Sequence, residues 1–403
     1  MYHRRVKAGS KIVFCVLFLA ADIPRRPSRT MTNTSVARCI NEALPEELFG
    51  VIFEEHAKLE WRAPVIDGQV CHQWRQTILR SPRAWAYLEI LQRCKPTPSQ
   101  FRQWLDRSGS VPLHIRRMER TLGAEEVLDP HCKRIRSITL QGSFIWLLNN
   151  RSFPILQSLT ITTQYRNLRL IRWSAPYAIP ELHSLRASNI SVDALPSNGF
   201  PVLRVLTLYR VNNCDCFIRN TSHSLTSLML YCVSLQYTSE SVEFPSLRFL
   251  SLFEVENIKH RMNIPTLTTY HEAGPTEGES FSVSLPFLIE YGVRRLIAEP
   301  FLNVTKLHQY YPNISRLSLR VQPSDVKLFL HSLSGQPSAL PMLRIIAVGG
   351  VYNIKYSGED EDSMRKDVLM RNMASSVNME LCFDGKDRVP LYFAYVTVYI
   401  NAD

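Results

Sequence analysis

The chain has 403 residues, of which 45% are hydrophobic and 21% charged, and its formal net charge is +11. This length fits two or three domains, and the composition excludes a largely disordered chain, a collagen-like chain and a coiled-coil rod. Residues 1–30 contribute +6, from seven basic residues and one acidic residue, which leaves +5 for the other residues. No stripe of basic and aromatic residues recurs in that larger part, so nucleic-acid binding is not expected.

Residues 1–40 are expected to be a disordered or targeting-like segment. Basic residues precede an apolar run at residues 12–21, which is typical of a secretory signal peptide and short for a bilayer span. N-x-[ST] triplets would also fit secretion, but they arise easily by chance. Alternatively, translation starts at Met31. We favour this second interpretation, because the segments that follow are typical of a cytoplasmic or nuclear protein with no membrane partner.

The sequence contains none of the common catalytic or cofactor-binding motifs. The nine cysteines are irregularly spaced and form no C-x-x-C pair, which excludes a zinc ribbon and a RING-type zinc site. Free thiols in a reducing compartment fit this pattern. The motifs of phosphate-binding loops, dinucleotide sites, zinc proteases and nucleophile elbows are missing as well. The sequence therefore predicts a protein that is not an enzyme, with no catalytic residues, cofactor or metal.

The first organised block, residues 41–92, predicts three short helices. Leu44, Leu48 and Ile52 lie four residues apart and predict one apolar helical stripe, with Phe53 beside it. Pro45 suits the first helical turn, where its missing N–H would have no partner. Three short helices bury only a small core, so this block is expected to need a partner or a neighbouring domain.

A second helix is predicted over residues 66–78, where four apolar residues lie four apart: Ile66, Val70, Trp74 and Ile78. Ser81-Pro82 ends it and begins a third helix that carries Trp85 and Leu88. Asp67 interrupts the second pattern, since a buried aspartate is costly unless it is paired. Either Asp67 faces solvent or the second helix begins later.

This block resembles an F-box, whose pattern reads L-P-x-E-[IL]-x-x-x-I-F, then V-C-x-x-W-R, then S-P-x-x-W. The matching segments are Leu44-Pro45-Glu46-Glu47-Leu48, Ile52-Phe53, Val70-Cys71-His72-Gln73-Trp74-Arg75, and Ser81-Pro82 with Trp85. Residues 104–113 are similar to the W-L-x-R-S-G-x-x-P-L segment that often follows the F-box in expanded fungal families. The resemblance covers about residues 43–115 and implies docking on the Skp-type adaptor of a cullin–RING ubiquitin ligase.

An F-box packs one apolar set internally and lays another against its adaptor. Trp74 and Trp85 are expected in the core. The residues expected on the adaptor side are Leu44, Pro45, Leu48, Ile52 and Phe53. Residues 93–130 are expected to form a helical linker.

From residue 131 to residue 358 a phrase recurs, in which an apolar residue, often followed by proline, precedes the spacing L-x-x-L-x-L. Ten copies lie 20–29 residues apart, anchored on residues 133, 154, 180, 201, 223, 245, 265, 286, 312 and 341. This period is typical of leucine-rich repeats. The last two apolar positions are two apart and face one side of a short strand, so stacked copies predict an α/β leucine-rich-repeat-like solenoid with a parallel sheet. The asparagine that often follows the last leucine is mostly missing, which indicates an irregular array.

The residues that flank the strand leucines are expected to point outward and to align in columns. They include Gln157, Thr160, His183, Arg186, Arg204, Thr207, Ser227, Arg248, Ser251, Arg316 and Ser318. The set is rich in arginine and hydroxyl groups and nearly free of acids. Arginine forks suit carboxylates and phosphates, which predicts an acidic or phosphorylated target at Arg186, Arg204, Arg248 and Arg316. Alternatively, arginine only keeps this face soluble.

Residues 359–403 break the period. The acidic run at residues 359–362 is expected to be a solvated loop, residues 364–377 a helix, and residues 391–400 a strand that caps the open end of the array.

The sequence thus predicts an α+β protein in which a small all-α F-box module precedes the repeat array. The expected function is substrate recognition in a Skp–cullin–F-box ubiquitin ligase, with the repeats binding an unknown target protein. Two alternatives stay open. One is a non-degradative F-box scaffold, and the other is a secreted leucine-rich-repeat protein.

Overall fold

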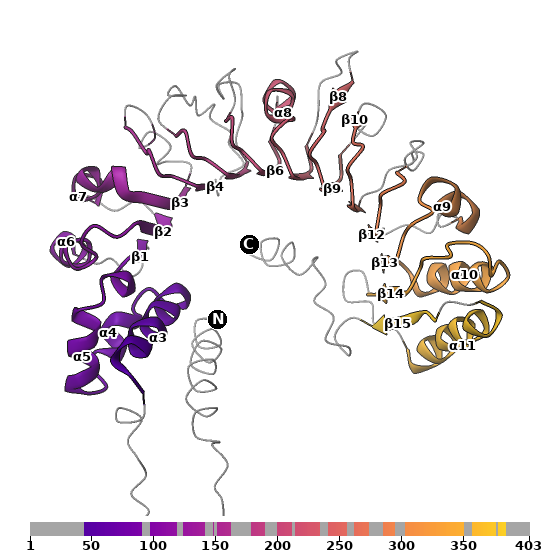
Figure 1. The fold of residues 1–403 in the computed structure, drawn as a ribbon, viewed down its shortest axis with the longest axis horizontal. Helices are drawn as coiled ribbons and strands as arrows, with labels where there is room; N and C mark the ends of the chain where they lie inside the picture. Colours follow the sequence, from indigo (N-terminus) through magenta and orange to yellow (C-terminus); the bar gives the residue numbers. More distant parts are fainter. Residues whose placement is uncertain are drawn as a thin grey trace, which may run out of the picture. The chain divides into compact units, whose positions relative to one another are not determined.

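The computed structural model describes residues 44–90, 97–118, 124–141, 148, 151–162, 179–189, 200–211, 214–233, 241–255, 262–273, 285–294, 303–349, 357–375 and 378–383. The chain divides into two compact units, Met1–Gln164 with Tyr177–Leu182, and Tyr165–Pro176 with His183–Asp403. Both units join helices to a parallel sheet, which confirms the predicted α+β class and the parallel sheet (Figure 1). The expectations for residues 1–40 and 391–400 lie outside the described residues.

The first unit begins with helices and continues into a sheet. Its helical elements are α3 (Glu46–Leu59), α4 (Ala63–Asp67), α5 (His72–Leu79), the 3-10 helix η1 (Pro82–Trp85), α6 (Pro98–Arg107), α7 (Ala124–Leu128) and the 3-10 helix η2 (Asp129–Arg134). Its strands are β1 (Tyr87–Ile90), β2 (Leu113–Met118), β3 (Ile135–Gln141) and β4 (Ser158–Thr162). They pair in parallel in this order.

Three expectations for this unit need correction. The predicted second helix is two helices, because α4 ends at Asp67 and α5 begins after Cys71, whose Sγ accepts a hydrogen bond from the backbone N–H of Trp74. The predicted third helix is the short η1, and Leu88 lies in strand β1. The stretch expected as a helical linker contains strand β2 as well as α6 and α7, so the sheet begins earlier than the repeated phrase indicates.

The second unit contains most of the repeated phrases. Its main sheet has the order β5 (Ser184–Ser188), β6 (Val205–Tyr209), β7 (Ser227–Tyr231), β9 (Phe249–Phe253), β11 (Thr269–Ala273), β12 (Glu290–Arg294), β13 (Arg316–Arg320), β14 (Ile345–Val348) and β15 (Glu380–Phe383). The short strands β8 (Val242–Glu243) and β10 (Met262–Asn263) pair separately. Helices α8 (Asp215–Thr221), α9 (Val304–Tyr310), α10 (Pro323–Ser334) and α11 (Gly358–Ala374) lie on the outer side of this sheet (Figure 1).

Each phrase folds for a local reason. The proline is the second residue of a β-turn, since the N–H of the first leucine bonds to the carbonyl of the residue before proline, as from Leu203 to Phe200 and from Leu247 to Phe244. In the strand that follows, alternate side chains are buried, and Leu206 and Leu208 are both 0% exposed. Parallel register stacks these positions strand on strand, so the apolar core is continuous within the unit.

The position where asparagine was expected is a left-handed turn. Asn189, Arg210, Cys232 and Glu254 follow β5, β6, β7 and β9, and their φ angles are 53°, 49°, 51° and 49°. Each donates its backbone N–H to a carbonyl of the next strand, at 2.7–2.8 Å. Asparagine tolerates this conformation better than most residues with a side chain. Three of these four turns therefore form on residues that are poorly suited to them.

The carboxyl end differs from the expectation. The acidic run is the first turn of α11, not a loop, because Ser357 caps the helix and accepts a hydrogen bond from the N–H of Asp360. Acidic residues also suit the positive end of a helix dipole. Strand β15, which the repeated phrase does not predict, is the last described strand and pairs with β14.

A buried arginine joins α11 to α10. Arg371 is 3% exposed, and its guanidinium donates to the carbonyl oxygens of Leu333, Gln336 and Ala339 at 2.6–3.1 Å. These groups lie at or just after the end of α10, where carbonyls have no partner within the helix. Burial lowers the pKa of Arg371 from its usual value.

Replacing this arginine should be costly. We expect Arg371→Met to lower the free energy of unfolding by about 1–3 kcal/mol, because the carbonyl of Ala339 loses the guanidinium and the carbonyls of Leu333 and Gln336 keep only their backbone donors, the N–H groups of Gln336 and Ala339. Urea denaturation followed by circular dichroism measures the change. The control is Lys366→Met on the exposed face of the same helix, which should stay within about 0.5 kcal/mol of wild type. Equal stabilities of the two variants would contradict this role.

The left-handed turns give a second prediction. Arg210→Asn should raise the free energy of unfolding by roughly 0.5–1 kcal/mol, since asparagine adopts the left-handed region at lower cost. The control is Arg204→Asn, at an exposed position outside the left-handed region, which should bring no gain. Thermal melts of both variants decide the point, and a lower melting temperature for Arg210→Asn would show that its side-chain stacking on Tyr209, at 5.2 Å, matters more.

Candidate functional site

The helical part of the first unit has its own aromatic core. Phe49, Phe53 and Trp74 meet with ring centroids 5.2–6.0 Å apart, and Ile78 and Trp85 complete the cluster. Trp74 and Trp85 are therefore core residues, as predicted. Phe53 was expected on the adaptor side, and this is wrong: it is 1% exposed, because it lies one residue further round α3 than Ile52 and faces inward.

The opposite side of α3 is an apolar surface. Leu48, Val51 and Leu59 are 47%, 55% and 50% exposed, and Ile52 is half-buried. Since an α-helix turns once every 3.6 residues, Leu48, Ile52 and Leu59 share one side of it. We call Leu48, Val51, Ile52 and Leu59 the α3 stripe. These side chains form exposed apolar area on α3.

The two remaining residues of the expected adaptor surface lie at the start of α3. Pro45 is exposed and immediately precedes the helix. Leu44 is partly buried and packs against the aromatic core. Leu44 therefore contributes to internal packing as well as to the surface.

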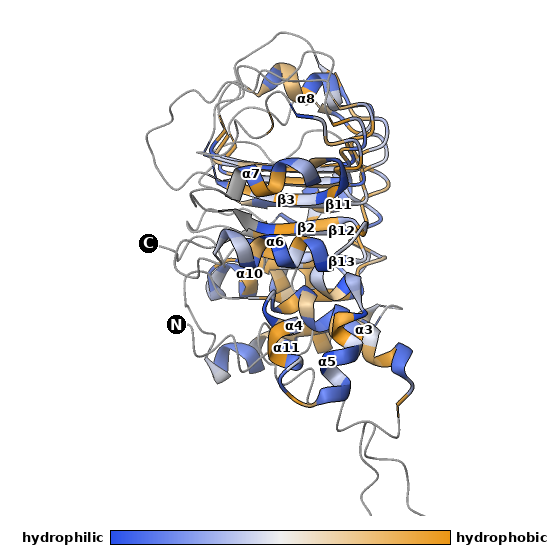
Figure 2. Cartoon of the chain, turned by 90° about the vertical axis from the view of Figure 1, so that its left-hand side faces the viewer, coloured by the Kyte–Doolittle hydropathy of each residue, from blue (hydrophilic) through white to orange (hydrophobic). Residues whose placement is uncertain are grey.

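A second group of exposed apolar residues lies on and around α4 and α5. Val65, Ile66, Val70 and Leu79 are 43%, 49%, 60% and 42% exposed. Two of them, Ile66 and Val70, were expected on the buried side of a continuous helix, and the break between α4 and α5 turns them outward. Hydrophobic segments alternate with hydrophilic ones along α3, α4 and α5 (Figure 2).

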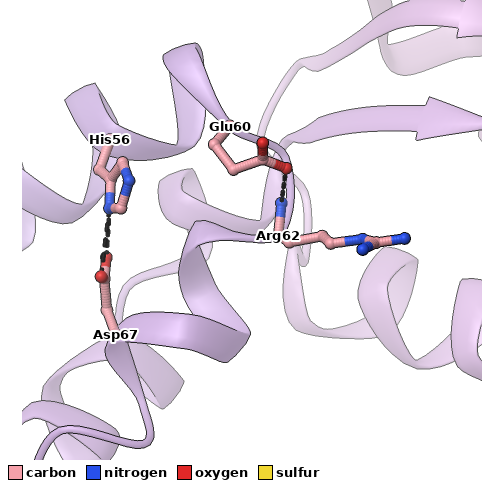
Figure 3. Close-up of polar contacts among 4 residues, drawn as sticks. All are labelled: His56, Glu60, Arg62 and Asp67. Atoms are coloured by element: carbon pink, nitrogen blue, oxygen red, sulfur yellow. Dashed lines mark hydrogen bonds and ion pairs between the residues drawn. The ribbon is translucent and has the colours of Figure 1, made fainter. Parts of the chain in front are cut away.

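A part-buried side-chain hydrogen bond links α4 to α3. Nδ1 of His56 lies 2.9 Å and 3.1 Å from the two carboxylate oxygens of Asp67, and Asp67 is 6% exposed (Figure 3). Between the helices, the backbone N–H of Arg62 donates to Glu60 (Figure 3). The helix that carries Trp74 and Ile78 begins later than predicted, at His72, as the second alternative held, and Asp67 does not face solvent. It is buried and paired, which removes the cost that its position in the apolar pattern implied.

The sheet of the second unit places the four predicted target-binding arginines in two kinds of position. Arg186 is the third residue of β5 and Arg316 the first of β13, and both alternate with buried residues on the face away from the helices. Arg204 and Arg248 each precede a strand by one residue and are exposed. They lie at the amino ends of β6 and β9, where backbone hydrogen bonds from Arg204 to His183 and from Arg248 to Thr226 align them with the neighbouring repeats.

The same face carries an acid that the expectation overlooked. Oε1 of Glu290 lies 3.4 Å from Nε2 of His271 and 3.8 Å from Nε of Arg316. Burial alone would raise the pKa of Glu290, but the hydrogen bond with His271 and the charges of His271 and Arg316 outweigh it and lower this pKa. Gly292 makes room for this arrangement, since a Cβ there would lie 2.6 Å from the ring of His271.

Two further features of the sheet, one aromatic and one polar, were not predicted. Tyr209, Tyr231 and Phe253 stand side by side at the fifth positions of neighbouring strands, with centroids 6.5 Å and 6.0 Å apart. On the buried face, Glu272 occupies a leucine position and accepts hydrogen bonds from Tyr270 and Tyr291, at 2.8 Å and 2.6 Å. The aromatic row could have been predicted from the sequence, because an aromatic residue follows L-x-L in three successive copies. The group around Glu272 could not, because it depends on contacts between residues of different strands.

The described part of the chain contains neither a candidate metal site nor a candidate membrane-spanning helix. No group of three or more histidine, cysteine or acidic residues there could hold a metal ion. Among the described helices, none has the length and apolar character needed to cross a bilayer.

The contact between His56 of α3 and Asp67 of α4 can be tested by removing one partner. His56→Leu should lower the free energy of unfolding by about 2–4 kcal/mol, because it leaves the buried carboxylate of Asp67 uncompensated. The double variant His56→Leu/Asp67→Leu should recover part of this loss, since no buried charge remains. Chemical denaturation of both variants measures the difference. A double variant less stable than His56→Leu would show that the carboxylate is not the cause.

The chain was also compared with known proteins. No protein-family model matches it, and no curated protein matches it significantly.

Proposed function

We propose that this chain is a substrate-recognition adaptor of a Skp–cullin–F-box ubiquitin ligase. In this proposal the helical module, residues 41–92, is an F-box that docks on a Skp-type adaptor, and the strands that follow form a leucine-rich-repeat-like array that holds a target protein. The chain itself contributes no catalytic residue. Its contribution is proximity, since it brings the target to the ubiquitin-transfer machinery.

The α3 stripe is the observation that carries the docking half. Small helical modules bury little surface, so they rarely leave large side chains exposed without a use. Here the core is closed by Phe49, Phe53 and Trp74, and the stripe adds nothing to it. Its apolar area supports docking on a protein partner, and the order of the F-box-like segments favours a Skp-type adaptor as that partner.

The sheet supports the target-binding half. Its face away from the helices combines half-buried aromatic rings with arginine, a composition enriched at protein interfaces. The chemistry expected from the sequence, an acidic or phosphorylated target, is modified by Glu290, because this carboxylate offsets part of the positive charge around Arg316.

Docking is tested most cleanly at residues that do not support the fold. We expect Leu48→Ala/Val51→Ala to reduce co-purification with a Skp-type adaptor strongly, since central apolar anchors typically cost about 2 kcal/mol or more when they are truncated. Thermal stability should change little, because both side chains are about half exposed. Leu44→Ala/Pro45→Ala should also weaken docking, but Leu44 packs on the core, so this variant mixes binding with stability.

The control is Leu328→Ala on α10, which removes a leucine of the second unit that is 69% exposed, more than Leu48 or Val51. It should bind the adaptor like wild type. If Leu48→Ala/Val51→Ala binds the adaptor like this control, the proposed docking surface is wrong.

A further inference from the structure

The residues that immediately precede four neighbouring strands form a continuous row at the amino edge of the second unit's sheet. They are Arg204, Thr226, Arg248 and Thr268, which precede β6, β7, β9 and β11. From Thr226 onward, the backbone N–H of each of them donates to the carbonyl of the one before, at 2.8–3.0 Å. We call these four residues the amino-edge row. Its backbone is held in place by this chain of hydrogen bonds.

Arginine and threonine alternate along the row. Arg204 and Arg248 are exposed, and Thr226 and Thr268 are half-buried. The hydroxyl of Thr226 donates to the carbonyl of Arg204 at 3.1 Å, and that of Thr268 donates to the carbonyl of Arg248 at 3.0 Å. Since both hydroxyl protons are already donated, the two guanidinium groups are the side-chain donors that the row offers to a ligand.

The chain segments that form this edge carry positive charge and no negative charge. Residues 200–205, 222–227, 244–249 and 264–269 contain two arginines, one histidine and no acidic residue. Neither Arg204 nor Arg248 makes an ion pair or a side-chain hydrogen bond with another described residue. Both guanidinium groups can therefore bind an anion without giving up a contact that the structure shows.

The acidic residues nearest along the chain or on the next strand are placed elsewhere. Glu243 lies on β8, which pairs with β10 and not with the main sheet. On β12, Glu290 lies against His271 and Arg316. Glu181, in the preceding copy, belongs to the first unit. The row thus presents a formal charge of +2.

The two arginines define a spacing. They are two strands apart, which is roughly 9.6 Å at about 4.8 Å per strand. A polyproline II helix has about three residues per turn and a rise of about 3.1 Å per residue, so residues i and i+3 lie on one side, roughly 9.3 Å apart. In a β-strand, residues three apart point to opposite faces. An α-helix presents residues seven apart on one face at about 10.5 Å. Polyproline II is therefore the closest match in distance and direction together.

Each arginine suits one carboxylate. The planar guanidinium can form two parallel hydrogen bonds with a carboxylate. Register places the copy of Thr226 between those of Arg204 and Arg248, so the two charges are separate points along the edge. Two carboxylates held at the same spacing neutralise both.

We propose that the amino-edge row binds a polyproline II segment of the target in which two acidic side chains, three residues apart, each contact one of the two arginines. This inference rests on the proposed function, because it names the class of target that the adaptor would recognise.

The test uses the purified full-length chain and a fluorescein-labelled peptide of six Glu-Pro-Pro repeats. A peptide of three Glu-Glu-Pro-Pro-Pro-Pro repeats has the same composition and net charge but no glutamates three residues apart. Because residues 1–30 carry +6 and attract any acidic peptide, the difference between the two peptides is the readout. Fluorescence anisotropy should show binding at least about threefold tighter for the regular peptide, as expected when a second exposed ion pair forms.

Three outcomes overturn the proposal. Equal binding of the two peptides would show attraction by net charge alone. Tighter binding of a peptide with a single phosphoserine would show that both arginines share one phosphate. Tighter binding of an alanine-rich helical peptide with two glutamates seven residues apart would show that the target is a helix.

Variants locate the site. Arg204→Gln and Arg248→Gln should each weaken binding of the regular peptide about three- to fivefold. The matched control is Arg210→Gln, which removes an exposed arginine at the other end of β6 and should leave binding unchanged. Arg204→Glu/Arg248→Glu should bind six Lys-Pro-Pro repeats better than wild type does, a gain that requires a folded chain. If Arg248→Gln and Arg210→Gln bind the regular peptide equally, the row is not the site.

Failure here is separable from failure of the proposed function. Arg204→Gln/Arg248→Gln should still co-purify with the Skp-type adaptor, since these residues and the α3 stripe belong to different units. No preference for the regular peptide, with normal co-purification of the adaptor, refutes the row and leaves docking in place. Loss of docking with the peptide preference intact refutes the docking half alone.

Discussion

The burial of every second strand residue in parallel register is the constraint on which the second unit depends. A single phrase of the repeat has too little apolar surface to fold alone, but Leu206, Leu228 and Leu250 stack directly in register and shield one another. The alternate positions on the other face can therefore hold polar, charged or aromatic side chains without disturbing the core. The group around Glu290 is held in place because the backbone of its strands is fixed by buried side chains on the opposite face, among them Tyr270, Tyr291 and Leu317.

Polar groups buried by this packing are satisfied by specific partners. Arg371 meets the carbonyls at the end of α10, and Tyr270 and Tyr291 meet the carboxylate of Glu272 inside the apolar stack. In the first unit His56 does the same for Asp67. Such contacts contribute little net stability compared with an apolar core, but removing one partner is expensive, so they restrict how the elements can pack.

Helix α3 has a buried aromatic side and an exposed apolar side. Phe49 and Phe53 close the core from one side of α3, while Leu48 and Val51 stay exposed on the other. The core therefore does not depend on the α3 stripe, which is why substitutions there can separate binding from stability. The α3 stripe and the amino-edge row belong to different units, and each proposal can fail without the other.

The sequence by itself determined the strands of the repeated phrase, because L-x-x-L-x-L and the preceding proline act over a few residues, through strand alternation and turn geometry. It also placed Trp74 and Trp85 in the core and Leu48 on the surface. Tertiary structure decided what depends on contacts between distant residues. It turned Phe53 inward, broke the second helix and paired Asp67 with His56. It also aligned Tyr209, Tyr231 and Phe253, because only the register between strands brings residues from different copies into one row.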